Sequence, residues 1–141
     1  ITAYDIHKDD DFLSTYPFVN FVNDIDYIYS NSDIISLHLP HNSSTNELIN
    51  KNVIENKLKK KPVIINTARG KLVNSEDIVW GINNNKIKGY LCDVLENEPI
   101  SDNEVLIGKE NIIITPHVGS RTYENVEKQG IKAIENLIKN L

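Results

Sequence analysis

Short apolar runs recur along the chain, each rich in β-branched side chains and closed by a turn residue. Runs of this length and composition are typical of β-strands. Most are continuous rather than alternating, a pattern that predicts strands covered on both faces. The strands expected from these runs cover residues 1–4, 33–40, 62–66, 88–94 and 111–115.

Helix signals separate these runs and follow the last of them. One helical pattern covers residues 51–58, and a second opens with acidic residues at 75–77, where they oppose the positive end of the helix dipole. The last segment, 126–141, repeats apolar residues near helical spacing, with Ser120 or Thr122 as its cap. Strands alternating with helices predict an α/β domain, a Rossmann-type parallel sheet with right-handed crossovers.

The composition is that of a soluble globular protein, with 40% hydrophobic and 25% charged residues in 141 positions. A chain of this length forms one domain, here residues 1–141. Its net charge of -5 disfavours a nucleic-acid partner, and no apolar stretch is long enough to span a membrane. A single cysteine, Cys92, excludes an internal disulfide and predicts a reducing, cytoplasmic setting.

Ligands of an open parallel sheet bind at the carboxyl ends of its strands, so the polar residues there are the candidate site. Asp5 ends the first run, and its carboxylate suits the ribose hydroxyl pair of NAD while repelling the 2′-phosphate of NADP. An ordinary turn residue is the alternative. The glycine-rich phosphate loop is expected upstream of Ile1. We therefore expect the 141 residues to be a fragment that binds NAD only weakly by itself.

Arg69 is one of only two arginines and follows the run 62–66, where Gly70 permits a tight turn. A guanidinium binds a carboxylate through two parallel hydrogen bonds, which lysine does not reproduce. An arginine at this position of a lysine-rich chain therefore predicts an anionic substrate. A surface or helix-capping arginine is the alternative.

His117 follows the last strand run, directly after Pro116, a position suited to proton exchange near neutral pH. Glu96 and Glu98 follow the run 88–94, and either carboxylate would fix the tautomer of this histidine. A solvated acidic loop is the alternative. The remaining histidines are weaker candidates for proton exchange. We expect His38 to be a core residue and His7 and His41 to be loop residues, and none of them is spaced as a metal ligand.

Three segments together resemble the D-isomer-specific 2-hydroxyacid dehydrogenases, a family that includes phosphoglycerate, glycerate and D-lactate dehydrogenases. They are residues 32–40, 65–73 and 89–99, the last continued by 111–119. Their order and spacing both match, and the similarity covers essentially the whole chain. The resemblance implies hydride transfer between NAD and a D-2-hydroxy acid or its 2-oxo acid, in a homodimer.

The resemblance also implies parts that the 141 residues do not contain: a substrate domain, and a central strand with its glycine-rich loop. The missing strand is expected between the strands that end at Asp5 and at Arg69. Members of the family also serve as transcriptional co-regulators. A non-catalytic, NAD-responsive regulator and a structural or dimerisation module therefore remain alternatives to the enzyme.

Carried over position by position, the catalytic arginine falls on Arg69, the glutamate on Glu98 and the histidine on His117, leaving Glu96 as a bystander. Arg69 would hold the substrate carboxylate and polarise the carbonyl, and His117, kept protonated by Glu98, would donate a proton. The cofactor-binding positions implied by the resemblance are Asp5, Pro40, Thr45, Thr67, Ala68, Asp93, His117 and Gly119.

Overall fold

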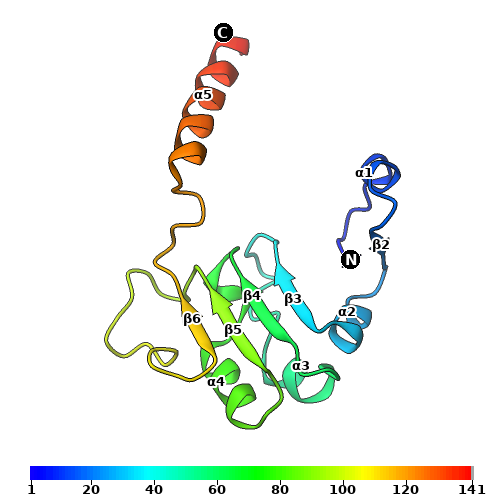
Figure 1. The fold of residues 1–141 in the computed structure, drawn as a ribbon, viewed down its shortest axis with the longest axis vertical. Helices are drawn as coiled ribbons and strands as arrows, with labels where there is room; N and C mark the ends of the chain where they lie inside the picture. Colours follow the sequence, from blue (N-terminus) through cyan, green and yellow to red (C-terminus); the bar gives the residue numbers. More distant parts are fainter. Residues whose placement is uncertain (141) are drawn as a thin grey trace.

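The computed structural model describes residues 1–140 and contains two parallel sheets with helices between the strands (Figure 1). The larger sheet has the order β3-β4-β5-β6, and β1 pairs with β2 in a separate ribbon. The strands are β1 (Thr2–Ala3), β2 (Asn20–Phe21), β3 (Ile34–Leu37), β4 (Val63–Asn66), β5 (Gly89–Cys92) and β6 (Ile112–Ile114). All five strands expected from the apolar runs are present, each shorter than its run.

The three expected helices are also confirmed. Each begins after a side chain that caps its first turn: Asn50 accepts from the Val53 N–H, Asn74 from that of Asp77, and Thr122 from that of Asn125. The helices are α1 (Asp10–Thr15), α2 (Ile25–Asn31), α3 (Lys51–Asn56), α4 (Ser75–Asn83) and α5 (Tyr123–Lys139), with a 3-10 turn at Gly70–Leu72.

The sequence reasoning missed α1, β2 and α2, which lie between the first two expected strands. Their signals were local and short. Asp9 and Asp24 each accept a backbone hydrogen bond at the first turn of a helix of six or seven residues. Two aspartates before short helical patterns were the available clue.

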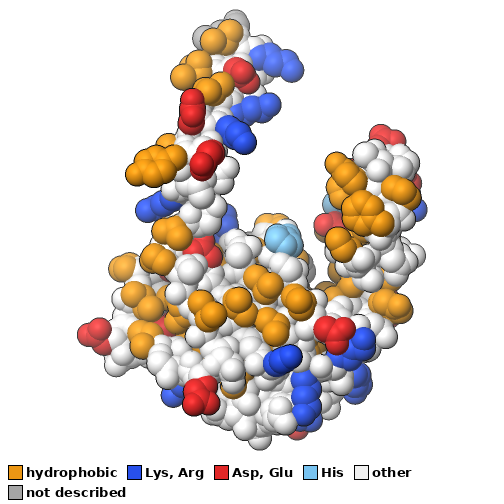
Figure 2. Space-filling view, viewed as in Figure 1, with side chains coloured by type: hydrophobic (Ala, Val, Ile, Leu, Met, Phe, Trp, Pro, Cys, Tyr) orange, Lys and Arg blue, Asp and Glu red, His pale blue; other side chains and the backbone are white. Residues whose placement is uncertain are grey.

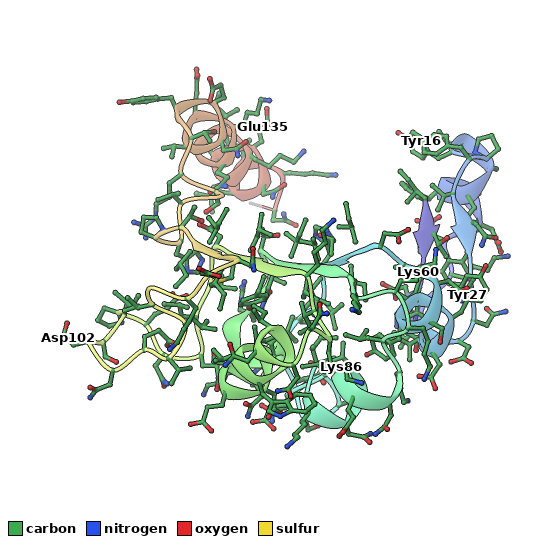
Figure 3. All side chains as sticks on the ribbon, turned by 60° about the horizontal axis from the view of Figure 1, so that its bottom comes forward. Tyr16, Tyr27, Lys60, Lys86, Asp102 and Glu135 are labelled. Carbon is green, nitrogen blue, oxygen red and sulfur yellow. The ribbon has the colours of Figure 1, made fainter. Side chains whose placement is uncertain are left out.

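The larger sheet is covered on one face only, so the expectation of cover on both faces is wrong. Burial alternates along β3, where Ile35 and Leu37 are buried and Ile34 is 62% exposed. Right-handed crossovers that step in one direction, from β3 to β4 to β5, place α3 and α4 on the same face. Figure 3 shows both helices on one side of the sheet, whereas α5, which carries Glu135, projects away from it.

The expected position of a missing strand is also wrong. Arg69 follows β4, and β4 already pairs with β3 on one side and β5 on the other. No strand can therefore lie beside it. The unpaired edges of the larger sheet are those of β3 and β6.

The register of the larger sheet brings the carboxyl ends of its strands together. Leu37 pairs with Asn66, Asn66 with Cys92, and Cys92 with Ile114. The loops that follow these strands therefore begin along one edge of the sheet. This is the edge at which parallel sheets bind ligands.

Helix α5 leaves this edge and extends from the body, with its apolar side chains in solvent (Figures 1 and 2). Val126, Leu137 and Ile138 are 58%, 61% and 69% exposed. Leu141, the last member of the predicted apolar stripe, lies outside the described residues. No helix within residues 1–140 is both long and apolar enough to cross a lipid bilayer.

Gly70 is needed because another backbone passes against it. A Cβ at Gly70 would lie 1.9 Å from the carbonyl carbon and oxygen of Leu95, whereas a Cβ at Gly130 in α5 would have nothing within 4 Å. We expect Gly70→Ala to lower the free energy of unfolding by about 2 kcal/mol. Gly130→Ala should raise it by roughly 0.5 kcal/mol, because alanine favours an exposed helix. Urea unfolding measures both, and equal midpoints for the two variants would contradict the close approach.

Candidate active site

A cavity of about 250 Å³ opens where the loops after β4 and β5 meet the end of β6. Arg69, Glu98 and His117, which sequence reasoning singled out from three separate loops, all line it. His41 and Lys71 line the same cavity, although His41 was expected to be only a loop residue. Its position there depends on the path of the loop after β3, which carries no local sequence signal.

His117 and Glu98 form a hydrogen-bonded pair. His117 Nδ1 donates to Glu98 Oε2 at 2.7 Å, and Oε1 of the same carboxylate accepts from the Leu95 N–H at 2.9 Å. The hydrogen bond from His117, helped by that from Leu95, holds the pKa of Glu98 below its usual value. Glu98 therefore stays ionised and fixes the ring with Nδ1 protonated, which leaves Nε2 for proton exchange.

Glu96, the other carboxylate of this loop, points elsewhere. Its Oε1 accepts from the N–H of Ser75, the first residue of α4, at 2.6 Å. A carboxylate is favourable at the positive end of a helix dipole. Of the two glutamates that spacing left open, Glu98 is thus the one that contacts His117.

The turn that carries Arg69 is held by a buried amide. Asn66 is fully buried; its Nδ2 donates to the Arg69 carbonyl at 2.9 Å and its Oδ1 accepts from the Ala68 N–H at 3.1 Å. The Arg69 side chain is exposed, and its Nη1 donates to the Ala68 carbonyl. Sequence reasoning missed this role of Asn66. A polar residue ending an otherwise apolar strand was the available signal.

Asp93 follows β5 and is buried. Its carboxylate accepts hydrogen bonds from the Thr115 hydroxyl and from the N–H groups of Val118 and Gly119. Burial alone would raise the pKa of Asp93, but these hydrogen bonds outweigh it and lower that pKa. Asp93 and Gly119, both expected to contact a cofactor, thus contact each other.

The remaining expected cofactor positions lie at strand ends or in the loop after β3. The Thr45 hydroxyl donates to the Pro40 carbonyl at 2.7 Å and accepts from the Asn42 N–H at 2.8 Å, so Thr45 closes that loop. Asp5 follows β1, in the separate ribbon, and is exposed; its Oδ1 accepts from the His7 N–H at 2.8 Å. Thr67 is exposed directly after β4.

The chain matches known proteins over nearly its whole length. Residues 1–119 match the family model described as D-isomer specific 2-hydroxyacid dehydrogenase, NAD binding domain. A glyoxylate reductase of Thermofilum pendens is 36% identical over 98% of the chain, and a hydroxypyruvate reductase of Thermotoga maritima is 36% identical over all of it. The chain spans 40% and 45% of the lengths of these two relatives.

Solved structures give the same result. The PH0520 protein of Pyrococcus horikoshii is 31% identical with a TM-score of 0.85, over 99% of this chain and 40% of its own. A glyoxylate reductase of Paecilomyes thermophila is 29% identical with a TM-score of 0.83, over 97% and 40%. An NAD-complexed D-isomer specific 2-hydroxyacid dehydrogenase of Lactobacillus delbrueckii ssp. bulgaricus is 26% identical with a TM-score of 0.77, over 99% and 45%. The chain therefore belongs to the D-isomer specific 2-hydroxyacid dehydrogenases, and its residues 1–119 match the model of their NAD-binding domain.

Proposed function

We propose that the protein is an NAD-dependent oxidoreductase that interconverts a D-2-hydroxy acid and the matching 2-oxo acid. The observation that carries this proposal is one cavity lined by a guanidinium, Arg69, and by a carboxylate–imidazole pair, Glu98 and His117. Relatives named glyoxylate reductase, hydroxypyruvate reductase and D-lactate dehydrogenase support a small 2-oxo acid as substrate.

The residues present fit NAD. The exposed carboxylate of Asp5 at the end of β1 suits two ribose hydroxyls. Asp93 uses three of about four acceptor positions of its carboxylate within the chain, which leaves one for the nicotinamide carboxamide. The backbone at Thr67 and Ala68, directly after β4, would line the nicotinamide ring. When bound, the reduced cofactor supplies the hydride that the carbonyl carbon of the substrate receives.

The chain's own residues supply binding and proton transfer. Arg69 binds the substrate carboxylate through two parallel hydrogen bonds and polarises the adjacent carbonyl. His117 donates its Nε2 proton to the carbonyl oxygen as the hydroxyl forms, and accepts it again in the oxidation direction. Glu98 holds the Nδ1 proton in both directions, so the ring keeps one orientation.

A cytoplasmic homodimer that binds neither nucleic acid nor membranes completes the proposal. The net charge of -5 argues against binding to a phosphate backbone. Cys92 is buried, and burial raises the pKa of its thiol to about 11, so it is an unreactive thiol suited to a reducing compartment. The exposed apolar side chains of α5 favour an assembled state.

The first test is turnover of small 2-oxo acids with NADH by the full-length protein, before and after Arg69→Lys. Lysine keeps the charge but loses the paired hydrogen bonds, so kcat/KM should fall by about a hundredfold while the Kd for NADH stays within about twofold. Arg121→Lys, at the only other arginine, is the matched control and should change neither value. NADH binding without turnover in the unmodified protein would favour the regulator, and an equal loss of NADH affinity in Arg69→Lys would remove Arg69 from substrate binding.

A second test asks whether Glu98 and His117 act as one unit. Because Glu98 holds the Nδ1 proton and the orientation of the His117 ring, Glu98→Gln should lower kcat for the reduction by roughly tenfold or more. His117→Ala should abolish most turnover, and adding Glu98→Gln should cost little more, since residues that act together are not additive. Glu96→Gln is the control and should leave kcat for the reduction unchanged. An unchanged kcat in Glu98→Gln, or additive losses in the double variant, would exclude Glu98 from the mechanism.

A further inference from the structure

His117 has a backbone conformation that its surroundings must maintain. Its φ is 53°, in the left-handed region that residues other than glycine rarely adopt. Within the turn itself, the His117 N–H donates to the Thr115 carbonyl at 3.0 Å. A residue in this region persists only when neighbouring contacts hold it there. The ring of His117 is directed by this turn, so whatever fixes the turn also fixes the ring.

The Asp93 carboxylate contacts the turn on both sides of His117. On the near side it accepts from the hydroxyl of Thr115. On the far side, Oδ1 accepts from the Val118 N–H at 2.9 Å and Oδ2 from the Gly119 N–H at 2.7 Å. Three donors from a run of five residues thus converge on one carboxylate, and His117 lies between them.

The Asp93 carboxylate lies close against the backbone of Gly119. A Cβ there would lie 2.9 Å from Asp93 Oδ2, which real Cβ atoms essentially never do. The position of Asp93 is itself fixed, because its N–H donates to the Asn66 carbonyl at 3.0 Å at the end of the β4–β5 ladder. The turn is therefore tied to the sheet through a short, buried side chain rather than through a flexible one.

We propose that Asp93 is a positioning residue for proton transfer: its carboxylate clamps residues 115–119 and so holds His117 with Nδ1 on Glu98 and Nε2 free for the substrate. This role is distinct from contact with the cofactor carboxamide. Its catalytic consequence rests on the proposed function, but the clamp is a property of the chain and is measurable without turnover.

Asp93→Asn tests the clamp directly in the full-length protein. An asparagine presents one carbonyl oxygen and an amide NH₂, and the NH₂ faces N–H donors that it is unable to satisfy. Without cofactor, the amide protons of Val118 and Gly119 should exchange with solvent at least about tenfold faster than in the unmodified protein. In turnover, kcat should fall by roughly ten- to a hundredfold while KM for the 2-oxo acid stays within about threefold, because misplacement of a proton donor affects the chemical step.

A pair of substitutions at Thr115 gives an independent measurement that leaves Asp93 in place. Thr115→Val removes the hydroxyl that donates to Asp93, whereas Thr115→Ser retains it. Thr115→Val should speed exchange at Val118 and Gly119 and lower kcat by several-fold, and Thr115→Ser should keep both near the unmodified values. This pair decides the question if Asp93→Asn fails to fold.

Unchanged exchange at Val118 and Gly119 in Asp93→Asn, or in Thr115→Val, would overturn the clamp. A weaker Kd for NADH with unchanged exchange would reduce Asp93 to a cofactor contact. Faster exchange with unchanged kcat and pH profile would separate the turn from catalysis and overturn the positioning role. If the unmodified protein turns over no 2-oxo acid, the proposed function fails, while the exchange rates still decide whether the clamp exists.

Discussion

Two polar side chains buried at neighbouring strand ends, Asn66 and Asp93, determine the geometry of the site. A buried polar group destabilises the fold unless it is hydrogen-bonded, so each must find partners. Asn66 finds them in the turn that carries Arg69, and Asp93 finds them around His117. One set of hydrogen bonds therefore pairs the buried polar groups and also positions Arg69 and His117.

The third functional side chain is tied to the same framework by close packing. The backbone of Leu95 passes so near Gly70 that no side chain fits between them. The Leu95 N–H in turn donates to Glu98, whose other oxygen meets His117. A contact between the loops after β4 and β5 thus sets the carboxylate at the distance that the imidazole requires. Because the three groups come from different loops, none is placed by its own strand alone.

The sequence was sufficient for elements with a strong local signal. Apolar runs marked five of the six described strands, and capping residues such as Asn50 and Thr122 marked three of the helices, because both signals depend on residues close in the chain. The exposed face of the sheet did not follow from the runs, since it depends on the direction in which successive crossovers step. Position along the chain also did not distinguish Glu96 from Glu98 as the partner of His117. The difference between them depends on where α4 begins, because Glu96 binds the first residue of that helix. The roles of Asn66 and Asp93 required knowing which turns fold back onto them.

We propose that Arg69 and His117, which line one cavity, act on the same substrate. A crystal structure of the full-length protein with NADH and oxamate, an unreactive analogue of a 2-oxo acid, tests this most directly. We expect the oxamate carboxylate to pair with the Arg69 guanidinium through two hydrogen bonds, and His117 Nε2 to lie within about 3 Å of the adjacent carbonyl oxygen. Oxamate bound away from Arg69, or with its carbonyl oxygen turned from His117, would contradict it.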